Sequence, residues 1–332
     1  MNLCAASLIL IACAPALAQD TVPVFHATSD LVLVDVQVLR KKTRTAAPAI
    51  QRSDLRVYED DAEQAILFFS RDELPLSIVF LFDLTESDRP ILKGLAAGAR
   101  TALAHLKPED EVAVMDYAAT AYLVDGFTKD RARTAAAIHA AARSRKPQEA
   151  AFFNEAVWQA VAELNRGANP AGRRVVIWLT DNYANVPAPR IVKHFGKGMT
   201  MDRLHSERQA IQALHESGTV VAPLIRKSRV MLPFIALELA AEKPLARRYP
   251  PGDVYKYAEL TGGEALKLGR RSVEERLGQL IDELRSRYTI GYKPSAGKPA
   301  GSFCRLRVIL APEGSLRPEE WDVLATAGYY RM

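Results

Sequence analysis

From Pro75 to Arg287, short continuous apolar runs alternate with helical patterns. An uninterrupted apolar run of six to eight residues between polar residues is typical of a strand buried on both faces. Strands that alternate with helices form βαβ units, so the sequence predicts an α/β fold with a doubly wound, mostly parallel sheet. The expected buried strands are Ser77–Phe82, Glu111–Tyr117, Arg174–Thr180 and Thr219–Ile225.

Both flanks of this region have strand patterns without helices. Residues 21–73 contain short runs rich in β-branched and aromatic residues, at Leu31–Leu39, Asp54–Glu59 and Ala65–Phe69. Residues 288–332 return to the same pattern. We therefore expect a central domain over residues 74–287 and an accessory β module that combines the N-terminal and C-terminal segments.

The first 18 residues have the pattern of a signal peptide. Leu3–Ala18 has no charged residue and ends in Ala16-Leu17-Ala18, an A-x-A cleavage site. We expect an exported protein, periplasmic or extracellular, with no transmembrane segment. Leu10-Ile11-Ala12-Cys13 is an alternative lipoprotein signal with Cys13 as the lipidated residue, and we favour simple export over lipid anchoring.

A loop of oxygen-bearing side chains follows the first buried strand. Asp83, Thr85 and Ser87 place one carboxylate and two hydroxyls at alternate positions. Ligands of α/β sheets bind beyond the carboxyl ends of the strands. Hard oxygen donors suit Mg²⁺, Ca²⁺ or Mn²⁺. The structural alternative is a helix N-cap, because Ser87 or Asp88 can cap a helix whose first turn contains Pro90, a residue favoured there.

The order of several motifs resembles a known family. Asp83-Leu84-Thr85-Glu86-Ser87 is followed about a hundred residues later by Thr180-Asp181, as in the von Willebrand factor type A domain and its metal-ion-dependent adhesion site. Val57-Tyr58-Glu59-Asp60, Thr261-Gly262-Gly263 and Tyr288-Thr289-Ile290-Gly291-Tyr292 resemble the exported VWFA-related proteins described from Acidobacteria. The resemblance runs from about Phe25 to the C-terminus.

The resemblance implies a metal site at Asp83, Thr85, Ser87 and Asp181. The family's remaining ligand, a Thr in a Gly-Gly-Thr loop, is replaced by Ala151. We expect a degenerate site that binds Mg²⁺, Mn²⁺ or Ca²⁺ weakly or not at all, because affinity follows the number and charge of the ligands.

The resemblance also implies a function in binding. We expect a non-catalytic, adhesion-type module that recognises a protein or cell-envelope partner at the carboxyl ends of the strands, and no nucleic acid. Two alternatives stay open. One is a purely structural protein of envelope assembly. The other is a haloacid-dehalogenase-like phosphoryl-transfer enzyme with Asp83 as its nucleophile, although that chemistry usually has a second acid where Thr85 stands.

Overall fold

The computed structural model describes residues 31–71, 74–85, 89–118, 120–144, 151–170, 172–184, 204–226, 251–268 and 272–331. The expected signal peptide over residues 1–18, including Cys13, lies outside these residues, as does Ser87. In the described part of the chain, no helix combines the length and the apolar character that a membrane span requires.

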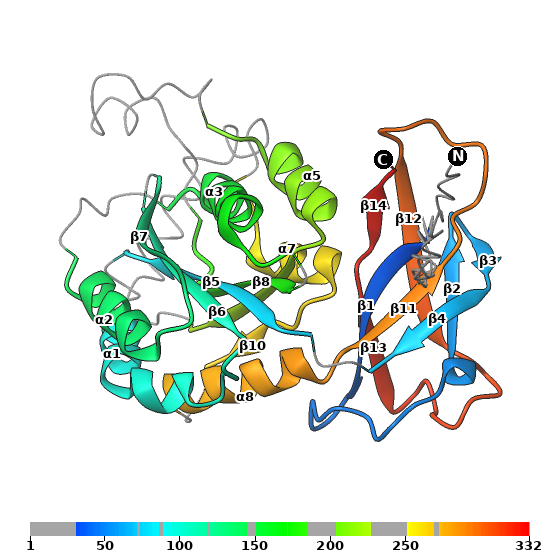
Figure 1. Ribbon diagram of the computed structural model, residues 1–332, viewed down its shortest axis with the longest axis horizontal. Helices are drawn as coiled ribbons and strands as arrows, with labels where there is room; N and C mark the ends of the chain where they lie inside the picture. The colour runs from blue at the N-terminus through cyan, green and yellow to red at the C-terminus, as the bar shows by residue number, and fades with distance from the viewer. Residues whose placement is uncertain are drawn as a thin grey trace, which may run out of the picture. The chain divides into compact units, whose positions relative to one another are not determined.

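A six-stranded sheet forms the centre of the α/β domain, the part of the chain from β5 to α8 (Figure 1). Its strand order is β10-β9-β8-β5-β6-β7, and all neighbours pair in parallel except β6 and β7. The strands are β5 (Leu76–Asp83), β6 (Glu111–Tyr117), β7 (Ala121–Thr128), β8 (Arg173–Thr180), β9 (Val220–Ile225) and β10 (Leu266–Lys267).

Helices cover both faces of this sheet (Figure 1). Alternate residues of β5 separate the two cores: Ile78 and Phe80 pack on one face, Val79 and Leu81 on the other. The first face carries α1 (Arg89–Leu103), α2 (Arg131–Ala142) and α8 (Val273–Arg285). The second carries α3 (Phe153–Gly167), α5 (Glu207–Ser217) and α7 (Val254–Thr261). All eight residues of β5 are buried, as its apolar run predicts.

The β module consists of two four-stranded sheets built from both flanks of the α/β domain. One sheet has the order β13-β1-β11-β4, and the other has the order β14-β12-β2-β3. The first comprises β1 (Val32–Arg40), β4 (Ile66–Ser70), β11 (Tyr288–Tyr292) and β13 (Trp321–Ala325); the second comprises β2 (Leu55–Glu59), β3 (Ala62–Gln64), β12 (Phe303–Leu310) and β14 (Gly328–Tyr330). A third core of Val, Ile, Leu and Tyr side chains joins them.

The fold class predicted from the sequence is confirmed: a mostly parallel sheet between helices, with an accessory β module. The sequence pattern did not reveal β13. All five of its residues are half-buried, so no buried face alternates with an exposed face, and the sequence lacks the alternation of apolar and polar residues that marks a strand. β4 and β11 are hydrogen-bonded neighbours, with Ser70 opposite Thr289, so the α/β domain is inserted between two adjacent strands of one sheet.

Arg173, the first residue of β8, connects the two parts of the structure. Its side chain is 1% exposed and forms two hydrogen bonds with Asp35 of β1, from Nε to Oδ2 at 2.7 Å and from Nη2 to Oδ1 at 3.2 Å. Its Nη1 donates to the carbonyl oxygen of Leu284 at 3.1 Å. A single side chain thereby joins the central sheet, α8 and the β module.

We predict that Arg173→Ala lowers the free energy of unfolding by about 2–4 kcal/mol, because it leaves the carbonyl of Leu284 and the carboxylate of Asp35 without their charged donor. Urea unfolding followed by fluorescence measures this change. Arg174→Ala is the matched control, since Arg174 bonds to Asn165 on the surface, and a change below about 0.5 kcal/mol is expected there. Equal effects of the two substitutions would contradict the role given to Arg173.

Candidate functional site

Asp83 is the last residue of β5 and is 2% exposed. Its Oδ2 accepts hydrogen bonds from the hydroxyls of Tyr117, at 2.8 Å, and Thr180, at 3.1 Å. Its Oδ1 accepts one from the backbone N–H of Thr85 at 2.9 Å. The carboxylate therefore lies in a closed set of donors at the carboxyl end of the sheet.

Strand pairing explains this arrangement. In the parallel register, Asp83 is opposite Tyr117 of β6, and Phe82 is opposite Leu179 of β8, the residue before Thr180. The Nε1 of Trp178 also donates to the Tyr117 hydroxyl at 2.9 Å. Three neighbouring strands thus contribute one hydrogen-bonded network, which joins Asp83 of β5, Tyr117 of β6, and Trp178 and Thr180 of β8.

Asp181 follows Thr180 at the end of β8 and is half-buried, with its Oδ1 accepting from the backbone N–H of Tyr183 at 2.9 Å. Burial and the negative charge of Asp181 raise the pKa of Asp83 to about 6, against the opposing effect of the hydrogen bonds from Thr85 and Tyr117. The two carboxylates are therefore close enough to interact, and their repulsion favours a positive charge between or beside them.

Asn182 follows Asp181 in the loop after β8. Its φ of +60° lies in the left-handed region, which asparagine tolerates better than most residues. Its side chain donates from Nδ2 to Asp253 Oδ1 and accepts from the backbone N–H of Val254, both at 3.2 Å. The loop after β8 is thereby fastened to the start of α7.

Ala151 precedes α3 and is fully buried. α3 begins after Phe152, which provides no side-chain cap, and the backbone N–H of Phe152 donates to the carbonyl of Ala118 at 3.2 Å. The methyl group of Ala151 gives this loop no oxygen ligand.

Asp83, Thr85 and Asp181 thus come together at the carboxyl end of β5 and β8. This end of the sheet lies within the segment, residues 78–184, that matches the family model of the von Willebrand factor type A domain. The segment belongs to the von Willebrand factor type A family. The match covers about a third of the chain and contains strands β6 to β8 completely. We call the whole α/β domain, from β5 to α8, the A domain.

Solved structures give more distant similarities to the chain, and no curated protein sequence matches it. BatB from Bacteroides thetaiotaomicron is 13% identical, with a TM-score of 0.41, over 63% of this chain and 98% of that chain. The proximal thread matrix protein 1 of the mussel byssus is 11% identical, with a TM-score of 0.41, over 64% and 48%. The PilB minor pilin from Streptococcus sanguinis is 11% identical, with a TM-score of 0.40, over 65% and 63%.

The A-domain residues fit a divalent cation in the kind of donor but not in the full number. Asp83 and Asp181 provide carboxylates whose repulsion a cation would relieve, and Thr85 provides a hydroxyl. Ala151 provides none. Mg²⁺ prefers six oxygen ligands and retains water where protein ligands are missing.

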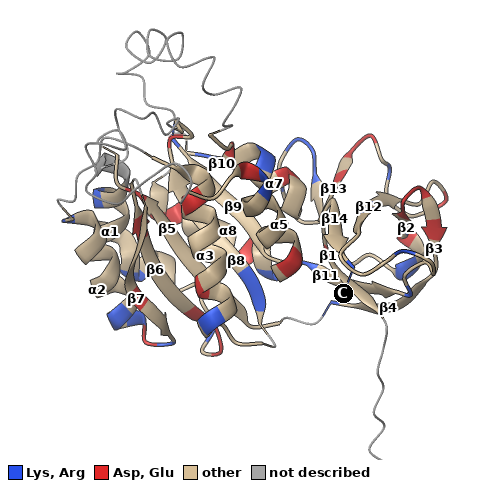
Figure 2. Cartoon of the chain, turned by 90° about the horizontal axis from the view of Figure 1, so that it is seen from above, with Lys and Arg blue, Asp and Glu red and all other residues tan. Residues whose placement is uncertain are grey.

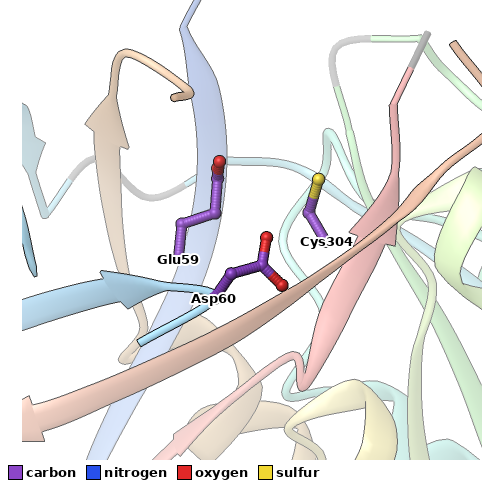
Figure 3. Close-up of side chains that lie close together, drawn as sticks. All are labelled: Glu59, Asp60 and Cys304. Carbon is purple, nitrogen blue, oxygen red and sulfur yellow. The ribbon is translucent and has the colours of Figure 1, made fainter. Parts of the chain in front are cut away.

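A second group of potential ligands, which the sequence did not suggest, lies in the β module. Glu59, Asp60 and Cys304 come within 4.8 Å of one another through one ligand atom each (Figure 3). However, Glu59 already accepts from the hydroxyls of Tyr292 and Tyr329, at 2.7 and 3.0 Å. The Nζ of Lys298 lies 2.5 Å from Asp60 Oδ2. This ammonium group already supplies the positive charge that a metal would bring.

The roles of Tyr117, Thr180 and Trp178 were also not predicted. Each looks like an ordinary strand residue in the sequence, and only the pairing of β6 and β8 with β5 places their polar atoms around Asp83. A useful signal would have been that Tyr117 and Thr180 both end apolar runs in neighbouring parallel strands.

We predict that Asp181→Asn lowers the pKa of Asp83 from about 6 towards its ordinary value of 3.8, because it removes the like charge. Because the pKa of Asp83 is raised in the folded protein, its protonated carboxyl group adds to the free energy of unfolding. This contribution is complete below about pH 4 and is lost as the pH rises through 6. The variant should lose less stability across that window. Carboxyl carbon NMR titration, together with urea unfolding at each pH, measures both quantities.

Asp282→Asn is the control. Asp282 lies on α8, and its carboxylate contacts His105, which follows α1. It should leave the titration of Asp83 unchanged. An Asp83 pKa that does not move in Asp181→Asn would show that the two carboxylates do not interact.

Proposed function

We propose that the chain is an exported, non-catalytic binding module that recognises a protein or cell-envelope partner at the carboxyl ends of β5, β6 and β8. The observation that carries this proposal is the Asp83–Asp181 carboxylate pair at that edge of an A domain, next to a loop that lacks its hydroxyl ligand at Ala151. Export rests on the pattern of residues 1–18.

The surface around this site supports recognition of a macromolecule. The half-buried loop Asp181–Ala184 borders it and is fixed to α7 through Asn182. Tyr122 and Leu123 of β7 are 45% and 49% exposed. Tyr122 pairs with Asp116, the neighbour of Tyr117, so both side chains belong to the same end of the sheet. Exposed aromatic and aliphatic side chains beside polar groups are typical of protein interfaces.

The distribution of charge supports a protein or envelope partner over a nucleic acid. The net charge of +5 is small for 332 residues. Basic and acidic residues are interspersed over the described helices and strands (Figure 2). Binding to a phosphate backbone depends on basic residues gathered on one surface.

A catalytic role for Asp83 has less support. A nucleophilic carboxylate must reach its substrate. Asp83 is 2% exposed and both of its oxygens accept hydrogen bonds from the protein. Its contacts suit a structural or ligand-supporting group. Phosphatase activity that disappears in Asp83→Asn would contradict this conclusion.

We further propose that the degenerate site binds Mg²⁺, Mn²⁺ or Ca²⁺ weakly, through Asp83, Thr85, Ser87 and Asp181. We predict that Ala151→Thr increases the affinity for Mg²⁺ by about tenfold or more, because it restores a hydroxyl ligand. Calorimetric titration measures the affinity, and the native chain should bind only in the millimolar range.

Ala151→Val is the matched control, since Val has nearly the shape of Thr without the hydroxyl. It should bind no better than the native chain. Equal affinities of the two variants, or no binding by either, would contradict the assignment of this loop to a metal site.

We predict that immobilised protein retains a partner from cell-envelope extract and that Asp83→Ala weakens this retention. Because the cation site is incomplete, EDTA should reduce retention less than the substitution does. Asp282→Ala, on α8, is the control. A partner held equally well by Asp83→Ala would place recognition elsewhere on the chain, and the absence of any retained component would favour a purely structural role.

A further inference from the structure

Two buried glutamates lie where the A domain meets the β module. Glu264 follows the end of α7, and Glu283 lies on α8; they are 7% and 9% exposed. Glu264 accepts from Nε of Arg44, in the loop after β1, at 2.7 Å. The backbone carbonyl of Glu283 accepts from Nε2 of Gln37, in β1, at 2.8 Å. We call this place the seam.

Each glutamate has one carboxylate oxygen without a donor. Oε1 of Glu264 is bonded to Arg44, and Oε1 of Glu283 accepts from Nε2 of Gln279 at 2.6 Å. Oε2 of each residue is buried and has no hydrogen-bond partner among the described residues. A buried acceptor without a donor destabilises the folded state by roughly 1–3 kcal/mol, and more if it is charged.

The surrounding cations do not supply the missing donors. Arg44 also binds Asp322 of β13, at 2.5 Å. Arg276 of α8 donates to Gln279 at 2.8 Å. Arg287, fully buried, donates to Gln37 Oε1 at 3.1 Å and to the carbonyl of Gly262 at 2.8 Å. The Nε atoms of Arg276 and Arg287 have no partner within the described chain.

The other charged groups nearby are paired with one another. Asp35 binds Arg173, and Arg285 binds Asp110 through Nη2 at 2.6 Å. Asp282, on α8, binds His105 at 2.8 Å. Arg44 and Arg287 attract Glu264, and Arg276 and Arg44 attract Glu283, but no described group donates to either Oε2 atom.

We propose that Glu283, with Glu264 beside it, binds a proton that holds the seam together, and that loss of this proton loosens the seam. A neutral carboxyl group is far less costly to bury than a carboxylate whose Oε2 has no donor, so one proton on Glu283 relieves this cost. This device is separate from the ligand face of the A domain.

The electrostatics of the seam agree with this geometry. Burial and the like charge of Glu264 raise the pKa of Glu283 to about 7, although Gln279, Arg276 and Arg44 oppose the shift. The ordinary value is 4.5. A carboxyl group with a raised pKa in the folded protein stabilises it fully below its unfolded pKa, and this stabilisation is lost as the pH rises through the folded value. The seam should therefore weaken between about pH 4.5 and 7.

The test compares the full chain with Glu283→Gln and Glu264→Gln. The amide carries a permanent donor and no charge, so it imitates the protonated group. Carboxyl carbon NMR of the native chain should show one glutamate that titrates near pH 7, and this signal should be absent in Glu283→Gln. In Glu264→Gln, the midpoint of Glu283 should move towards 4.5.

Thermal unfolding from pH 5 to 8 gives the second readout. The melting temperature of the native chain should fall by roughly 5 °C more than that of Glu283→Gln. Hydrogen exchange should show lower protection of β1 and α8 at pH 8 in the native chain alone. Glu275→Gln, an exposed position on α8, should behave like the native chain.

The results decide the proposal even if one variant does not fold, because the titration of the native chain stands on its own. The absence of any glutamate that titrates between pH 6 and 8 would overturn it. A pH dependence in Glu283→Gln equal to that of the native chain would do the same.

Discussion

The parallel pairing of β5 with β6 and β8 is the constraint on which the rest of the structure depends. It places Asp83, Tyr117 and Thr180 in one row at the carboxyl end of the sheet, where their side chains form hydrogen bonds with one another. It also places Arg173 at the opposite end of β8, where it binds Asp35 of the β module. A shift of one residue in this register would separate Asp83 from its donors and Arg173 from Asp35 at the same time.

The parts that could be predicted from the sequence depend on local patterns. The apolar run of β5 and the residue that follows it indicated both a buried strand and Asp83 at its end. The order of motifs indicated the A domain, and Ala151 marked the incomplete ligand set. What could not be predicted depends on contacts between distant segments. Glu59 and Cys304 meet only through the pairing of β2 with β12, and Glu264 and Glu283 are buried only through tertiary packing.

Buried ionisable groups differ in their hydrogen bonds at two places in the A domain. Asp83 has donors from β6, from β8 and from the loop after β5, and these bonds oppose the rise of its pKa on burial without cancelling it. Glu264 and Glu283 share too few donors, although guanidinium groups lie beside them. The first arrangement suits a fixed framework for a ligand face. The second makes the junction with the β module sensitive to its protonation.

The insertion of the A domain between β4 and β11 has a mechanical consequence. Both connections leave the β module at the same end of one antiparallel pair, because Ser70 and Thr289 are opposite each other. A pull on the ligand face proposed above would enter both strands together and in the same direction. The hydrogen bonds between β4 and β11 are then neither sheared nor peeled, and the load passes to the neighbouring strand β1 and to the core beneath it. A bound partner would pull against a whole sheet.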